Sequence, residues 1–169
     1  MNPHLTEYNE SDRCDYMMVV SSMAGIDGEV TSEEIYAIRE LCLSFVLGPE
    51  ARGKVMAAST TPPDDMDDIL ERLAHTSLRY SLLLDLGTMA YKDHVLTAEE
   101  LAEYNRLAGK LRVDDNHAKH VLKFAESLFQ PGYTPAQAEA NLEALEQNGI
   151  PRAAVTMSAS MMAMGLEDR

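Results

Sequence analysis

The stretch MAGIDGEVTSEEI at residues 23–35 returns 66 residues later as MAYKDHVLTAEEL at residues 89–101. Both copies begin with Met-Ala and place one Asp, one Thr and a Glu-Glu pair at matched positions. Each copy follows an apolar segment and opens an amphipathic one, so the chain contains two similar helix–loop–helix units. The repeat predicts an all-α fold, a bundle of about eight or nine helices built from two similar helix–loop–helix halves.

Helix signals also dominate outside the repeat. Apolar residues recur at helical spacing in residues 35–46, 101–111 and 118–129, and residues 81–91 are apolar on nearly every side. A threonine three residues before an acid or amide can cap two backbone donors reciprocally, and this pattern predicts four helix starts. The four pairs are Thr31 with Glu34, Thr61 with Asp64, Thr97 with Glu100, and Thr134 with Gln137.

Composition restricts the class of partner. The chain of 169 residues carries a net charge of −14, which disfavours nucleic acid and anionic membranes because both repel an acidic surface. Cations and basic protein surfaces fit that charge. No apolar stretch approaches the roughly 18 residues of a membrane helix, and the N-terminus lacks a basic segment followed by an apolar one. We therefore expect a cytoplasmic protein without direct membrane insertion, and we expect Cys14 and Cys42, which lack CxxC spacing, to be buried reduced thiols.

The repeated stretch has some features of a calcium-binding EF-hand loop. Such a loop needs oxygen ligands at positions 1, 3 and 5, glycine at position 6 and Glu at position 12. With Gly28 at position 6 and Glu34 at position 12, Met23 and Gly25 take positions 1 and 3. The second copy has Met and Tyr at those two positions and His94 in place of the glycine. Neither loop is therefore expected to bind calcium with EF-hand geometry.

A shorter pattern is common to both copies: Ala, then Asp three residues later, then Val or Leu, Thr and Glu. In the first copy these residues are Ala24, Asp27, Gly28, Val30, Thr31 and Glu34, and in the second they are Ala90, Asp93, Leu96, Thr97 and Glu100. The pattern resembles the loop motif of the tellurite resistance TerB-like family, which includes the N-terminal region of DjlA-type co-chaperones. The resemblance covers residues 12–129.

The resemblance implies a TerB-like helical bundle whose two halves interlock around a pseudo-two-fold axis. We expect a single domain over residues 1–169, with a duplicated core at 12–129 and a C-terminal helical extension at 130–169. It also implies a non-enzymatic module that binds partner proteins, basic ones in view of the charge, in a stress or tellurite-resistance context. A metal site comes with the family as well, formed by acidic residues of the two loops.

Carried over residue by residue, the metal ligands are Asp27 and Glu34 from the first loop and Asp93 and Glu100 from the second. Carboxylate oxygens suit a divalent cation such as Ca²⁺ or Mg²⁺ better than Zn²⁺. The same residues also have a purely structural interpretation. Both glutamates complete capping boxes, and both aspartates can end the preceding helix or accept backbone N–H bonds. The sequence leaves both interpretations open.

Two other functions remain as alternatives. One is a metal-dependent hydrolase that uses the same carboxylates with His94 or His117 as general base. The other is a structural module that forms a homodimer through the Met-rich C-terminal segment, where Met157, Met161 and Met164 share one helix face. The chain contains no GxSxG, HExxH, CxxC, GxGxxG or P-loop sequence, so the non-enzymatic interaction module is the preferred hypothesis.

Overall fold

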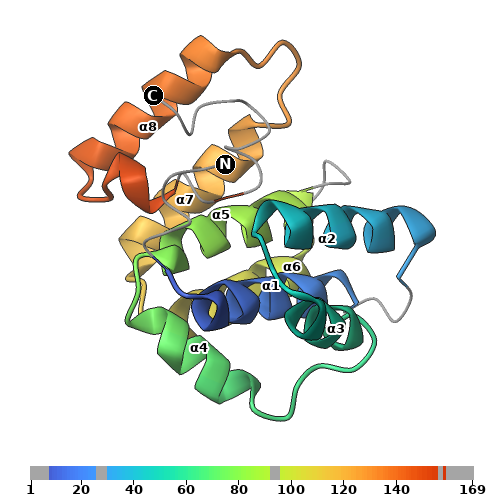
Figure 1. Cartoon of the computed structure of the whole chain (residues 1–169). Helices are drawn as coiled ribbons and strands as arrows, with labels where there is room; N and C mark the ends of the chain where they lie inside the picture. Colours follow the sequence, from blue (N-terminus) through green and yellow to red (C-terminus); the bar gives the residue numbers. More distant parts are fainter. Residues whose placement is uncertain (1–7, 26–29, 92–95, 156–157, 159–169) are drawn as a thin grey trace. The chain divides into compact units, whose positions relative to one another are not determined.

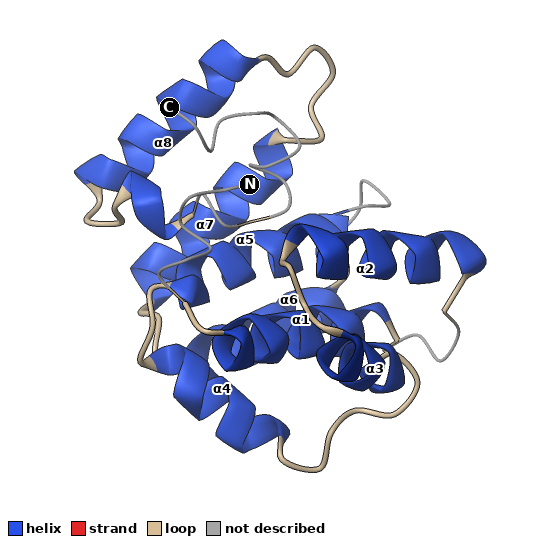
Figure 2. Cartoon of the chain, viewed as in Figure 1, coloured by secondary structure: helices blue, strands red, loops and turns tan. Residues whose placement is uncertain are grey.

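The computed structural model describes residues 8–25, 30–91, 96–155 and 158. Within these ranges the chain forms eight α-helices and one short 3₁₀ helix, with no β-strand (Figures 1 and 2). The predicted all-α class is confirmed. None of the described helices combines the length and apolar character that crossing a membrane requires.

The chain divides into two compact units, Met1–Leu73 and Ala74–Arg169. The first unit holds α1 (Glu10–Ala24), α2 (Ser32–Ser44), α3 (Pro49–Ala58) and α4 (Met66–Ala74), whose last residue falls at the boundary. The second holds α5 (Leu78–Tyr91), α6 (Ala98–Lys110), α7 (Asp115–Ser127), α8 (Pro135–Gln147) and the 3₁₀ helix η2 (Arg152–Ala154). The single domain over residues 1–169 and the pseudo-two-fold arrangement of its halves stay predictions.

Reciprocal caps start three of the helices, as the sequence predicts. At α2, Thr31 Oγ1 accepts the Glu34 N–H at 3.1 Å, and Glu34 Oε2 accepts the Thr31 N–H at 3.4 Å. The Thr97 and Glu100 pair does the same at α6, with distances of 3.1 and 3.5 Å. Thr134 and Gln137 form the third such cap, at α8.

The fourth predicted helix start is wrong. Helix α4 begins at Met66 and not just after Thr61. The physical reason is Pro63, because a proline disfavours the α conformation of the residue before it. Pro62 therefore cannot serve as the first helical residue, and the helix starts after the proline pair.

The repeat extends beyond the loop motif into the helix boundaries. Helices α2 and α6 are both 13 residues long, and their ends are offset by the same 66 residues as the sequence repeat. The first residues of α3 and α7, Pro49 and Asp115, keep that offset. Three consecutive helices are thus duplicated, α1 to α3 in the first unit and α5 to α7 in the second.

The C-terminal ends of α2 and α6 are also alike. Val46 and Arg112 follow them in the left-handed conformation, with φ of 55° and 57°. The Leu47 N–H donates to the Cys42 carbonyl and the Val113 N–H to the Ala108 carbonyl, both at 3.0 Å. This is the Schellman helix end, in which the left-handed residue is usually glycine. The chain adopts it twice without glycine.

Small residues let paired helices approach closely in each unit. In the first, Ser21 of α1 donates its hydroxyl to the Val55 carbonyl of α3 at 2.6 Å. Gly87 of α5 takes the matching position in the second, where an added Cβ would come within 2.9 Å of the Ala125 Cβ on α7. The first and third helices of each copy therefore pack with little space between their backbones.

Two glycine substitutions test the packing of the first unit. A Cβ on Gly25 would lie 1.9 Å from the Ser59 carbonyl oxygen, whereas a Cβ on Gly53 meets nothing within 4 Å. We expect Gly25→Ala to lower the free energy of unfolding by about 2 kcal/mol through overpacking. Gly53→Ala should raise it by about 0.5–1 kcal/mol, because alanine favours the helix. Urea unfolding followed by circular dichroism measures both, and equal effects would contradict the close approach at Ser59.

The left-handed helix ends give a second prediction. Holding an L-residue in the left-handed conformation costs about 1–2 kcal/mol. Glycine avoids this strain, but it loses more conformational entropy on folding, which costs about 0.5–1 kcal/mol. Val46→Gly should therefore stabilise the fold by up to about 1 kcal/mol, measured from the urea midpoint. Val46→Ala keeps the Cβ and serves as the control that gains less than Val46→Gly. A loss of stability in Val46→Gly would contradict the left-handed conformation.

Candidate functional site

The acidic loop residues divide between described and undescribed parts of the chain. Asp27 and Asp93 lie outside the described residues, as does His94. Glu34 and Glu100 are half-buried, and each carboxylate completes the cap of its own helix. The predicted capping role of the two glutamates is confirmed. Among the residues that the structure describes, no group of three or more His, Cys, Asp or Glu is arranged to hold a metal ion. The cation site stays a prediction.

His117, the alternative general base, joins two elements of the second unit. Its Nε2 lies 2.8 Å from the Asn148 carbonyl oxygen, to which it donates, and its Nδ1 lies 3.3 Å from Asp114 Oδ2. Its ring also packs edge-on near the Tyr80 ring, with centroids 6.0 Å apart. Both ring nitrogens thus have partners within the unit, and this arrangement favours a structural role for His117 over that of a general base.

The two cysteines are free and buried, as predicted. Burial raises the pKa of the Cys42 thiol to about 11, and it raises the pKa of Cys14 as well. Both thiols are therefore protonated and poorly nucleophilic near neutral pH. Met157, Met161 and Met164 of the predicted dimer helix lie outside the described residues.

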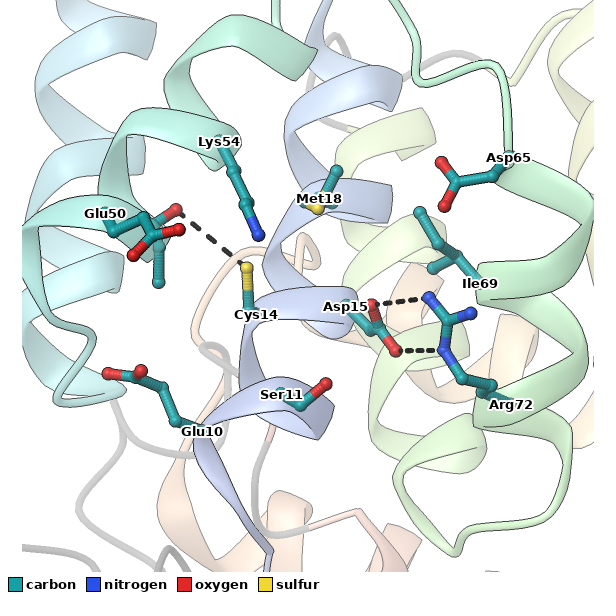
Figure 3. Close-up of a pocket in the computed structure, with 11 residues that line it drawn as sticks. Glu10, Ser11, Cys14, Asp15, Met18, Glu50, Lys54, Asp65, Ile69 and Arg72 are labelled. Carbon is teal, nitrogen blue, oxygen red and sulfur yellow. Dashed lines mark hydrogen bonds and ion pairs between the residues drawn. The ribbon is translucent and has the colours of Figure 1, made fainter.

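A cleft of about 540 Å³ opens in the first unit between α1, α3 and α4 (Figure 3). Met18 of α1, Ala51 of α3 and Ile69 of α4 provide its apolar lining. Figure 3 shows Lys54 extending from α3 toward α1, and Arg72 facing α1 from α4. Three helices of the first unit thus form one concave surface.

An ion pair fixes one wall of the cleft. Arg72 Nε donates to Asp15 Oδ2 at 2.9 Å and Arg72 Nη2 donates to Asp15 Oδ1 at 3.1 Å, a bidentate arrangement drawn as two dashed lines in Figure 3. The Asp15 side chain is 8% exposed and the Arg72 side chain 50% exposed. The hydrogen bonds that Arg72 donates to Asp15 raise the pKa of the Arg72 guanidinium. The pair connects α1 to α4 and leaves the buried carboxylate with a partner.

The rest of the cleft is lined by an excess of negative charge. Besides Asp15, it contains the carboxylates of Glu10, Glu50 and Asp65, against Lys54 and the already paired Arg72. Glu10 accepts the Gly48 N–H at 2.8 Å. The side chains of Glu50 and Asp65 stand at the rim, on exposed residues on either side of the apolar lining. Such a surface suits a positively charged group attached to an apolar stem.

No pattern in the sequence predicted this cleft. Asp15 and Arg72 are 57 residues apart, and no local pattern links them. The one available signal was Asp15 itself, a charged residue within the apolar run CDYMMVV, because a buried charge normally requires a partner.

Comparison of the chain with protein-family models finds no match, and neither a curated protein nor a solved structure matches it. The TerB-like resemblance is therefore carried by the two copies of the loop motif alone.

The ion pair generates a prediction about stability. Arg72→Met removes the partner of a buried carboxylate and should lower the free energy of unfolding by about 1–2 kcal/mol, a value reduced for the half-exposed arginine. The double variant Asp15→Asn with Arg72→Met should recover part of that loss, because no charge is left unpaired. Urea unfolding of both variants measures the difference. Unchanged stability in Arg72→Met would contradict a structural role for the pair.

Proposed function

We propose that this protein is a non-enzymatic, TerB-like protein-interaction module that binds a basic segment of a partner in the cleft between α1, α3 and α4. The observation that carries the proposal is the cleft itself, an apolar lining bordered by an excess of carboxylates. The stem of a partner lysine or arginine would lie along Met18 and Ile69. Its charged end would meet Glu50 or Asp65, since long basic side chains bury their stems and keep their charge in polar surroundings.

Electrostatics of the whole chain support a basic partner. The net charge of −14 attracts a positive segment from a distance and speeds its encounter with the protein. At the cleft, Lys54 makes binding selective among basic segments, because its ammonium group repels any segment that places a positive charge next to it. The Asp15–Arg72 pair holds one wall in place, so less conformational freedom is lost on binding.

The size of the cleft limits what it can do alone. A volume of about 540 Å³ accommodates one or two anchor side chains, and not a whole protein surface. Anchors of this kind commonly provide most of the binding energy of an interface, while the surrounding contacts exclude water. In a TerB-like setting the partner would belong to a stress or tellurite-resistance assembly.

A short basic peptide tests the cleft. The probe is a labelled peptide with one arginine between leucines, and the competitor is the same peptide with glutamate in place of arginine. Glu50→Gln with Asp65→Asn should weaken binding of the arginine peptide about tenfold, the equivalent of 1.4 kcal/mol.

The matched control removes the same charge elsewhere. Asp115→Asn with Glu143→Gln changes two exposed carboxylates of the second unit and should alter the dissociation constant less than about twofold. Fluorescence anisotropy gives both constants. Equal losses in the two variants would show that net charge, and not the cleft, binds the peptide, and the proposal would then be wrong.

The divalent cation is a separate part of the proposal. Asp27, Glu34, Asp93 and Glu100 offer the carboxylate oxygens that Ca²⁺ or Mg²⁺ prefers. Each glutamate already gives one oxygen to its own helix cap, so the cation would have to share that carboxylate with the cap. When bound, the ion would neutralise the loops and order the surface around them.

Calorimetry on the metal-stripped full chain tests the cation. Saturable binding of Ca²⁺ or Mg²⁺ that disappears in Asp27→Asn with Asp93→Asn is expected, with weaker binding of Zn²⁺. Absence of saturable binding would remove the cation from the proposal and leave the cleft and its peptide test unaffected.

A further inference from the structure

Large apolar side chains are unusually exposed on and just after α2. Tyr36 is 63% exposed, Leu43 50% and Val46 48%. Of the other large apolar residues that the structure describes, only Leu101 in the second unit is similarly exposed, at 38%. Tyr36 and Leu43 are seven positions apart, so they share one face of α2, and these two side chains are here called the apolar patch. Exposed apolar patches commonly mark interaction surfaces.

A groove of about 350 Å³ adjoins this patch, between α2 and α3. Cys42 and Leu43 of α2 and Met56 of α3 give it an apolar lining, and Arg39 and Arg52 place a guanidinium on each helix. Leu43 belongs to both the patch and the groove. The two features therefore form one continuous surface, here named the α2–α3 face.

Neither Arg39 nor Arg52 forms an ion pair with a carboxylate of the described residues. By contrast, Arg13 donates to the Phe45 carbonyl oxygen at 2.6 Å, and Arg72 pairs with Asp15. Glu40, the next residue after Arg39, is exposed on α2 and adds one negative charge nearby. Two unpaired guanidinium groups beside an apolar groove favour an acidic ligand with apolar anchors.

The second copy provides an internal comparison. The second copy has the same helix caps and the same left-handed helix end, but different residues occupy the positions of the α2–α3 face. The residues that match Tyr36, Arg39, Leu43 and Arg52 are Ala102, Asn105, Gly109 and Ala118. The duplicated fold thus forms without this surface, so its residues are not required by the architecture.

We infer that the α2–α3 face docks an acidic amphipathic helix of a partner protein. Tyr36 and Leu43 are seven residues apart on α2 and so about 10 Å apart along its axis, which equals the separation of anchors at i and i+7 on a bound helix. The ligand would place apolar side chains against Leu43 and Met56. Its carboxylates would accept hydrogen bonds from Arg39 and Arg52.

The charge of the chain favours a short segment over a second copy. Two copies with a net charge of −14 each repel one another far more strongly than one copy repels a helix with a few negative charges. The docking site is also distinct from the cleft. The groove uses Arg52 and Met56 of α3, whereas the cleft uses Ala51 and Lys54. The inference therefore stands independently of the proposed function.

A pair of designed peptides tests the inference on the full chain. Both are amphipathic helices with leucines at i, i+4 and i+7, one with glutamates and one with lysines on the remaining faces. The acidic peptide should bind saturably. The amide chemical shifts of the labelled protein should change mainly at residues of α2 and α3.

Two variants and one control locate the binding. Arg39→Glu with Arg52→Glu should weaken binding of the acidic peptide at least about tenfold, and Leu43→Ala, at a half-exposed position, about tenfold. Lys119→Glu with Lys123→Glu makes the same charge change on exposed residues of α7 and should have less than about a twofold effect.

Three results would overturn the inference. The first is the absence of saturable binding at concentrations of the acidic peptide up to about 1 mM. The second is an equal loss in the arginine and lysine variants. The third is a dimer, seen by light scattering, that Leu43→Ala converts to monomer, because the occupant would then be a second copy of the chain.

Discussion

The hydrogen bonds at the two ends of α2 and of α6 determine where the following helices begin. A threonine–glutamate box starts each helix, and a left-handed residue ends it 13 helical residues later. Since both ends are fixed, Phe45 and Leu111 are buried directly after the helices and α3 and α7 start at equivalent positions. The start of α3 sets which of its residues pack against α1, and so it determines which α3 residues line the two candidate sites of the first unit.

Helix α3 presents different chemistry in two directions. Residues two apart on a helix point to nearly opposite sides, which is why Arg52 lines the groove and Lys54 lines the cleft. The cleft carries an excess of carboxylates, and the groove carries two guanidinium groups that form no ion pair with the described residues. If both proposed surfaces bind their ligands, the protein would hold one basic and one acidic segment at once and so bring two partners together.

The sequence predicted those parts of the fold that depend on local chemistry. The starts at Thr31, Thr97 and Thr134 were predictable because a cap needs only residues three positions apart. The start at Thr61 was mispredicted because the conformational effect of Pro63 outweighed the cap signal. The left-handed conformation of Val46 was not predictable, since no glycine marks it. The Asp15–Arg72 pair was not predictable either, because it joins residues that are 57 positions apart and local sequence patterns do not indicate such contacts.

The duplicated architecture depends most on both copies ending their middle helix in the same way. Backbone NMR of the labelled full chain tests this directly through chemical shifts and the couplings between amide and Hα protons. We predict helical values over residues 32–44 and 98–110, each followed by a left-handed residue at Val46 and Arg112. A helix that continues past either residue, or an extended conformation at one of them, would contradict the duplicated architecture.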